Sequence, residues 1–262
     1  MEPGRPRPAG LARRVLKAKD VLCGSSSFMS IADNLAEVRA RIDVAAHRAG
    51  RSLEGITLMA VSKTFSAEHI REAYDAGARL FGENRVQEFA GKIDSLRDLR
   101  DAEFHLIGHL QTNKSAKAVE LFAAVDSVDS LRLAQKLNAS AQQSGKKISV
   151  LIEVNVGGEL AKNGVAPGSR ELEEILSAAR KLPHLEFRGL MTVPPFSDDP
   201  QQARPYFRQL RELRDHISAR KLPAIDMRTL SMGMSHDFEV AIEEGSTCVR
   251  VGTAIFGERT KA

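Results

Sequence analysis

The residue with the clearest capacity for covalent chemistry is a lysine at the end of a short apolar run. The run "ITLMAVSK" ends at Lys63. If it forms a β-strand, Met59, Val61 and Lys63 share one face, because side chains alternate along a strand. A lysine amine removed from water has a lowered pKa, and the neutral amine can attack an aldehyde. The alternative is a lysine that buries its stem and keeps its amine in water, and position alone leaves both open.

A second group of residues could bind a phosphate. The run "SMGMS", residues 231–235, precedes a helix expected to begin near His236. Its Ser231 hydroxyl, its Gly233 backbone and the free N–H groups of a helix N-terminus are suitable phosphate ligands. Gly252 and Thr253 follow a different strand and could complete the same site. The simpler alternative is an ordinary helix cap formed by Ser235.

An arginine within the last apolar run could also face a ligand. In "TCVRVG", Val249 and Val251 share one strand face, whereas Arg250 and Gly252 share the other. If the valines pack on outer helices, Arg250 points to the opposite side of the strand. A guanidinium keeps its charge when buried and needs an acceptor. That acceptor is either a buried carboxylate or a bound ligand, and the sequence leaves the choice open.

Strand-like runs and helical stretches alternate along most of the chain. An amphipathic helix over residues 30–50 comes first, and eight short apolar runs follow. Helices are predicted between them at 66–77, 84–99, from about 115, at 130–143, 169–181, about 201–219 and 236–244. Such alternation indicates parallel strands covered on both faces.

Eight strand–helix units predict one α/β domain, a single TIM (β/α)8-type barrel. Only about ten residues follow the last strand, so the helix over 30–50 is expected to complete the outer ring. In this fold ligands bind at the carboxyl ends of the strands, where Lys63, Arg250 and the segment 231–235 would meet. An open doubly wound sheet is the alternative, but the first strand lacks the Gly-x-Gly-x-x-Gly turn of dinucleotide folds.

Charge and composition argue against several classes of function. The net charge is +4, and residues 1–28 account for all of it with six Arg or Lys and two acidic residues. The rest is balanced, which disfavours nucleic acid as a partner. No apolar stretch approaches the roughly 18 residues of a membrane span, and the two cysteines, Cys23 and Cys248, show no metal-binding spacing. We expect a cytoplasmic protein with a disordered extension over 1–28 and one domain over 29–262.

Several longer motifs add a resemblance to a known family. They are "AVSKT" (60–64), "FGENRVQE" (81–88), "HLIGHLQTNK" (105–114), "GLMTV" (189–193), "LSMGMSHDFEVAIEEGST" (230–247) and "VRVGTAIFGER" (249–259). In these motifs the chain resembles the pyridoxal phosphate homeostasis protein family, whose barrel is related to the N-terminal domain of alanine racemase. The resemblance implies pyridoxal 5′-phosphate (PLP) as cofactor.

The same resemblance implies a role for each matching residue. Lys63 would form a Schiff base with PLP, Arg250 would face the pyridine nitrogen, and Asn84 would line the ring pocket. The phosphate would be held by Ser231, Gly252 and Thr253. No metal ligands are predicted.

The resemblance also implies a role in intracellular PLP (vitamin B6) homeostasis without robust amino-acid turnover. Alanine racemases add a second domain that supplies a tyrosine base, whereas this chain has only Tyr74 and Tyr206, both in predicted outer helices. The alternatives are a PLP-dependent racemase or lyase using Lys63 as its only base, and a PLP-free scaffold. Apo-forms of PLP-dependent enzymes are candidate recipients of PLP, and a monomer is expected.

Overall fold

A closed barrel of eight parallel strands lies at the centre of the molecule. The computed structural model describes residues 1, 30–159 and 162–258. Neighbouring strands follow chain order, and the first pairs with the last. The strands are β1 (Thr57–Val61), β2 (Leu80–Glu83), β3 (Glu103–Leu106), β4 (Ala124–Val128), β5 (Ile148–Glu153), β6 (Leu185–Met191), β7 (Ile225–Ser231) and β8 (Cys248–Val251). The predicted TIM-type α/β barrel is confirmed.

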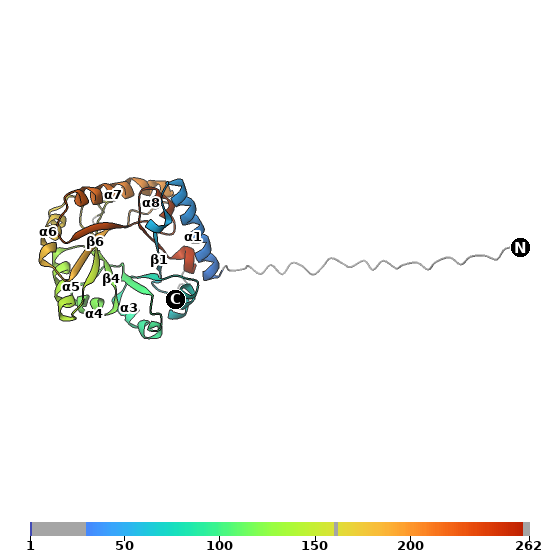
Figure 1. Ribbon diagram of the computed structural model, residues 1–262, viewed down its shortest axis with the longest axis horizontal. Coiled ribbons are helices and arrows are strands. Elements are labelled where there is room, and N and C mark those ends of the chain that lie inside the picture. Colours follow the sequence, from blue (N-terminus) through green and yellow to red (C-terminus); the bar gives the residue numbers. More distant parts are fainter. Residues whose placement is uncertain (2–29, 160–161, 259–262) are drawn as a thin grey trace.

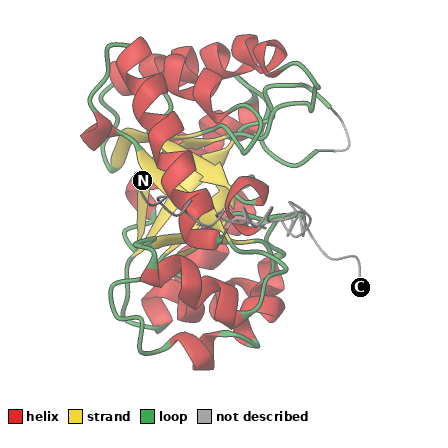
Figure 2. Cartoon of the chain, turned by 90° about the vertical axis from the view of Figure 1, so that its right-hand side faces the viewer, coloured by secondary structure: helices red, strands yellow, loops and turns green. Residues whose placement is uncertain are grey.

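Helices surround the strands, as Figure 1 shows in a view along the barrel and Figure 2 shows from the side. The α-helices are α1 (Ile31–Arg48), α2 (Ala67–Asp75), α3 (Val86–Ala90), α4 (Ser115–Leu121), α5 (Leu131–Gln143), α6 (Arg170–Ala178), α7 (Arg204–Ala219), α8 (Phe238–Glu243) and α9 (Thr253–Phe256). The 3-10 helices are η1 (Leu53–Gly55), η2 (Ile93–Leu96), η3 (Thr112–Lys114), η4 (Ala179–Lys181) and η5 (Pro200–Ala203). No helix in the described part of the chain is long and apolar enough to cross a membrane.

Helix α1 completes the outer ring, as predicted. It packs against α8, α9 and α2 and so covers the side of the barrel where β8 meets β1 (Figure 1). Ser30 begins the helix with a capping box, in which its hydroxyl accepts the Asp33 N–H while the Asp33 carboxylate accepts from Ser30. The predicted extension over 1–28 lies, apart from Met1, outside the described residues.

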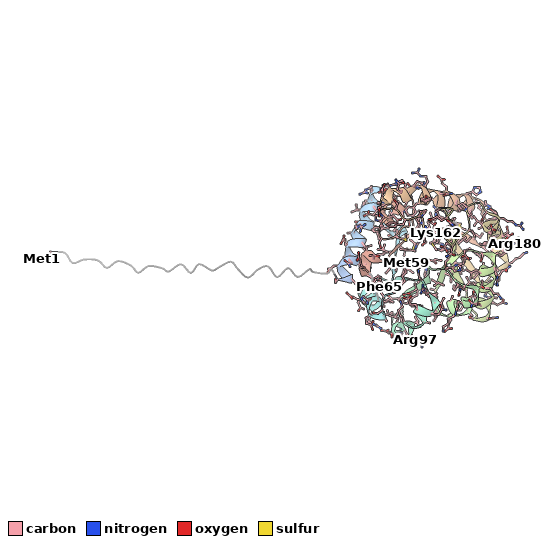
Figure 3. The ribbon with its side chains drawn as sticks, turned by 180° about the vertical axis from the view of Figure 1, so that it is seen from behind. Met1, Met59, Phe65, Arg97, Lys162 and Arg180 are labelled. Carbon is pink, nitrogen blue, oxygen red and sulfur yellow. The ribbon has the colours of Figure 1, made fainter. Side chains whose placement is uncertain are left out.

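The strands have two buried faces with different neighbours. Val249 and Val251 of β8 belong to the hydrophobic layer between the strands and the helices. Met59 of β1 lies within the ring of strands (Figure 3), where a Cβ on Gly82 would come within 2.8 Å of its sulfur. The alternation predicted for the first and last strands is therefore present.

Several predicted helices differ from the structure, since 169–181 is divided into α6 and η4 and about 201–219 into η5 and α7. The stretch 84–99 is divided into α3 and η2, and Gly91 caps the end of α3, in keeping with the low helix propensity of glycine. The helix predicted over 236–244 begins only at Phe238, with Asp237 at its N-cap. The preceding residues form a turn in which the Asp237 N–H donates to the Met234 carbonyl.

Candidate functional site

A cavity of about 460 Å³ lies where the carboxyl ends of β1, β2, β7 and β8 meet. Five of the six predicted site residues line it: Lys63, Asn84, Arg250, Gly252 and Thr253. These residues come from opposite ends of the sequence, and the pairing of β1 with β8 brings them together. A ligand in the cavity could contact an amine, a guanidinium and a hydroxyl at once.

Lys63 lies two residues beyond β1, in a tight turn. The strand ends at Val61, two residues earlier than predicted, yet Val61 and Lys63 both line the cavity. The turn closes through the Phe65 N–H, which donates to the Ser62 carbonyl. Thr64 has a φ of +71°, the conformation required at the third position of a type II turn. The Lys63 side chain therefore projects from a defined turn at the barrel mouth.

Arg250 is a buried cation with neutral partners. It is 4% exposed, and its guanidinium donates to the Ser231 hydroxyl and to the Thr192 carbonyl, both at 2.7 Å. Burial lowers the pKa of Arg250. Of the described residues, none places a carboxylate within 4.0 Å of it. The carboxylates of Asp126, Glu153 and Asp237 stabilise its charge without a direct hydrogen bond, and an acceptor in the cavity would add a direct partner.

Ser231 lies behind Arg250. It is fully buried in β7 and is not among the residues that line the cavity. Its hydroxyl accepts a hydrogen bond from Arg250. The predicted contact between Ser231 and a phosphate stays a prediction, and the structure gives Ser231 a second role, in which it orients the guanidinium.

The alternative that Ser235 caps the helix near His236 is wrong, because that helix begins at Phe238 with Asp237 at its N-cap. The Ser235 hydroxyl accepts the N–H groups of Gly252 and Ala254 at 3.1 and 3.3 Å, and Ser235 lines the cavity beside Thr253. The hydroxyls of Ser235 and Thr253 and the N–H groups of Gly252 and Ala254 therefore lie together at one end of the cavity. The sequence feature that could have identified Ser235 is its position at the end of "SMGMS". Gly233 precedes it with a φ of +92°, and a Cβ at Gly233 would lie 2.5 Å from the Ala241 Cβ.

The remaining walls include residues that the sequence did not single out. Asp237 lines the cavity, and burial raises the pKa of its carboxyl, which accepts the Met234 N–H. The loop from β6 to α7 forms another wall, and its Phe196 is 76% exposed and packs on the His236 ring. Strand alternation could not have identified these residues, because they lie in loops.

The assembled donors suit a phosphorylated aromatic aldehyde. The hydroxyls of Ser235 and Thr253 suit a phosphate, and the Gly252 N–H donates to Ser235 and so orients its hydroxyl. The Arg250 guanidinium suits a ring nitrogen with a lone pair, and Lys63 supplies the amine. The fold and the cavity thus define a class: a TIM barrel whose mouth can hold such an aldehyde against a lysine.

Comparison with known proteins identifies the family to which the chain belongs. The family model of the alanine racemase N-terminal domain matches residues 34–260. The pyridoxal phosphate homeostasis protein of Aquifex aeolicus is 47% identical over 88% of this chain and 99% of its own length. That of Escherichia coli K12 is 45% identical over 87% of this chain and 97% of its own. PipY of Synechococcus elongatus PCC7942, solved with PLP bound, is 38% identical, with a TM-score of 0.76 over 87% of this chain and all of PipY. The chain belongs to the pyridoxal phosphate homeostasis protein family.

Proposed function

We propose that this protein binds PLP in the cavity at the barrel mouth and serves intracellular PLP homeostasis. The observation that carries the proposal is the buried Arg250 guanidinium, whose hydrogen-bond partners among the described residues are neutral and which lines the same cavity as Lys63. The names of the two bacterial relatives and the PLP in the PipY structure support the choice of ligand.

Each cavity residue has a defined task in this proposal. Lys63, which lines the cavity, would supply the amine for a Schiff base with PLP. Ser235, Gly252 and Thr253 hold the phosphate, and Asn84 lines the ring pocket. Arg250 would donate to the pyridine nitrogen and so keep it unprotonated. PLP supplies an electron sink when bound, and an unprotonated ring is a weaker sink than one paired with a carboxylate.

We propose further that the protein turns over amino acids poorly. A two-base racemase needs a second proton donor on the far side of its substrate, often a tyrosine. Tyr74 contacts Asp101 from α2, and Tyr206 packs on the core from α7. Neither lines the cavity. A racemase or lyase that uses Lys63 as its only base is the alternative function.

An absorbance spectrum and a chemical trap test the proposal. The purified protein should show a Schiff-base band with PLP, and borohydride should fix the label on Lys63 by peptide mapping. Arg250→Gln should release PLP more readily on dialysis while still forming the Schiff base. Absence of the Schiff-base band after PLP is added would contradict the proposal. Racemisation or decarboxylation of common amino acids at roughly 1 per second or faster would favour the enzyme.

Partners and location form a further part of the proposal. Apo-forms of PLP-dependent enzymes are the proposed recipients of the bound cofactor. We also propose a monomer in the cytoplasm, with which the buried free thiol of Cys248 is consistent. Cross-linking of the PLP-loaded protein to an apo-enzyme and light scattering would test these points.

A further inference from the structure

A buried cluster of charges lies beneath the turn that carries Lys63. It consists of Glu83 at the end of β2 together with Glu88 and Lys92 from the segment that follows. The Glu83 side chain is fully buried, that of Lys92 is 12% exposed and that of Glu88 is 29% exposed. None of the three lines the cavity, so the cluster does not belong to the ligand site itself.

Lys92 holds both ends of this turn. Its ammonium donates to the carbonyl of Phe65 at 3.0 Å and lies 3.4 Å from the carbonyl of Ser62. These two residues are the first and last of the turn. The same ammonium also contacts both Glu83 oxygens at 3.0 and 3.1 Å. One cation therefore ties the turn to the end of the neighbouring strand.

The two carboxylates contact the turn as well. Glu88 accepts the N–H of Thr64, the residue with positive φ directly after Lys63. Glu83 accepts the hydroxyl of Ser62, the residue directly before Lys63, at 2.7 Å. Peptide or hydroxyl groups on both sides of Lys63 are therefore bound to the cluster. A turn with positive φ at a non-glycine residue is strained and needs such support.

We propose that Lys92, together with Glu83 and Glu88, is a positioning residue for Lys63, holding its turn in the geometry that reacts with an aldehyde. The proposal rests on the PLP-binding function because it gives Lys63 the covalent role. A lysine on a loose turn reaches the reactive geometry less often, and small misplacements of reacting groups slow reactions severely. The cluster thus acts on the lysine and not on the phosphate or ring contacts.

A double-mutant cycle distinguishes a role of Lys92 in positioning Lys63 from a role in stabilising the whole cavity. Lys92→Met should slow Schiff-base formation with PLP about tenfold or more, followed by stopped-flow absorbance. It should slow the reaction with pyridoxal by the same factor, since pyridoxal lacks the phosphate. In a Lys63→Ala background, Lys92→Met should leave the Kd for non-covalent PLP within about twofold. An equal loss of PLP affinity in both backgrounds would overturn the proposal, because Lys92 would then act on the whole cavity.

Arg51 offers a matched control. Like Lys92, it is a partly buried cation that binds two carbonyls, those of Ile242 and Ser246, but it lies at the other end of the strands. Arg51→Met should lower the Tm without slowing Schiff-base formation. If Arg51→Met slows it as much as Lys92→Met does, the effect is one of fold stability and the positioning role is wrong.

Two further measurements cover failure of folding or of PLP binding. Should Lys92→Met not fold, Glu88→Ala removes the Thr64 contact from a more exposed position and should slow the reaction severalfold. If the wild type does not retain PLP, the proposed function fails, yet reductive methylation of Lys63 by formaldehyde still reports on the amine. Peptide mapping should then find slower labelling of Lys63 in Lys92→Met, and an unchanged rate would overturn the positioning role alone.

Discussion

Within the barrel, individual charged residues are stabilised by specific partners. His105 of β3 lies 3.3 Å from the Asp126 carboxylate of β4, and Asp126 is 2% exposed. Burial alone would lower the pKa of His105, but the Asp126 charge and hydrogen bond raise it to about 9. His109 similarly lies 3.1 Å from the Asp129 carboxylate.

The raised pKa of His105 predicts a pH-dependent stability. The folded state binds the proton more tightly than the unfolded chain, whose value is about 6.5. The stabilisation is therefore complete below pH 6.5 and is lost as the pH rises through about 9. It amounts to at most about 3 kcal/mol. Urea unfolding of wild type and His105→Gln at several pH values should show curves that converge above pH 9, and parallel curves would contradict the assignment.

At the scale of elements, close backbone approaches set the path of the strands. The pairing of β6 with β7 shifts register between Phe187 and Gly189. Gly189 has a φ of +156°, and a Cβ there would lie 1.8 Å from the Thr229 carbonyl oxygen. Since that oxygen belongs to the backbone of β7, no side chain can move to make room. Gly189 is therefore required by the packing of two strands.

Substitution of this glycine should be severe. Gly189→Ala should lower the free energy of unfolding by more than about 3 kcal/mol, because strain and a backbone clash act together. Gly145→Ala is the matched control: its φ is +62°, but nothing lies within 4 Å of the added Cβ. It should cost about 1–2 kcal/mol, the usual penalty of a left-handed residue. Similar losses measured by urea denaturation for both variants would show that the clash is relieved.

At the scale of the whole molecule, closure of the barrel and ligand binding are linked. The cavity is lined by residues at the ends of β1, β2 and β8 and by the loops that follow β6 and β7, and thus by both ends of the chain. Helix α1 covers the closing strands and joins α8 through the ion pairs Arg41–Glu239 and Arg48–Glu243. A ligand that contacts both Lys63 and Arg250 would link β1 and β8, the two strands whose pairing closes the barrel. Binding should therefore stabilise the entire fold.

We expect PLP to raise the stability by about 2.7 kcal/mol at a free concentration about 100 times its Kd, because only the folded state offers the site. Calorimetry with and without PLP measures the rise in Tm. Lys63→Ala should show a smaller rise at the same concentration, since only the non-covalent contacts remain. An identical rise in both proteins would mean that the covalent link contributes nothing to retention.

Removal of residues 2–28 should leave the domain intact. Helix α1 begins with its own capping box at Ser30, so its first turn is complete without the upstream segment. The shortened protein should match the full chain in Tm and PLP affinity. A fall of several degrees in Tm would show that the segment contributes to the fold, and the predicted boundary at residue 29 would then be wrong.

The sequence by itself determined the barrel and the inward direction of its key side chains. Strand alternation is a local property, so Arg250 could be assigned to the inner face of β8 without any contact being known, whereas Lys63 reaches the cavity from the turn beyond β1. Only the tertiary structure decided which groups meet across loops: Ser231 behind Arg250, Ser235 on the Gly252 N–H, and Lys92 beneath the Lys63 turn. Those contacts depend on the stagger of the strands and the paths of the loops, which no short-range periodicity in the sequence records.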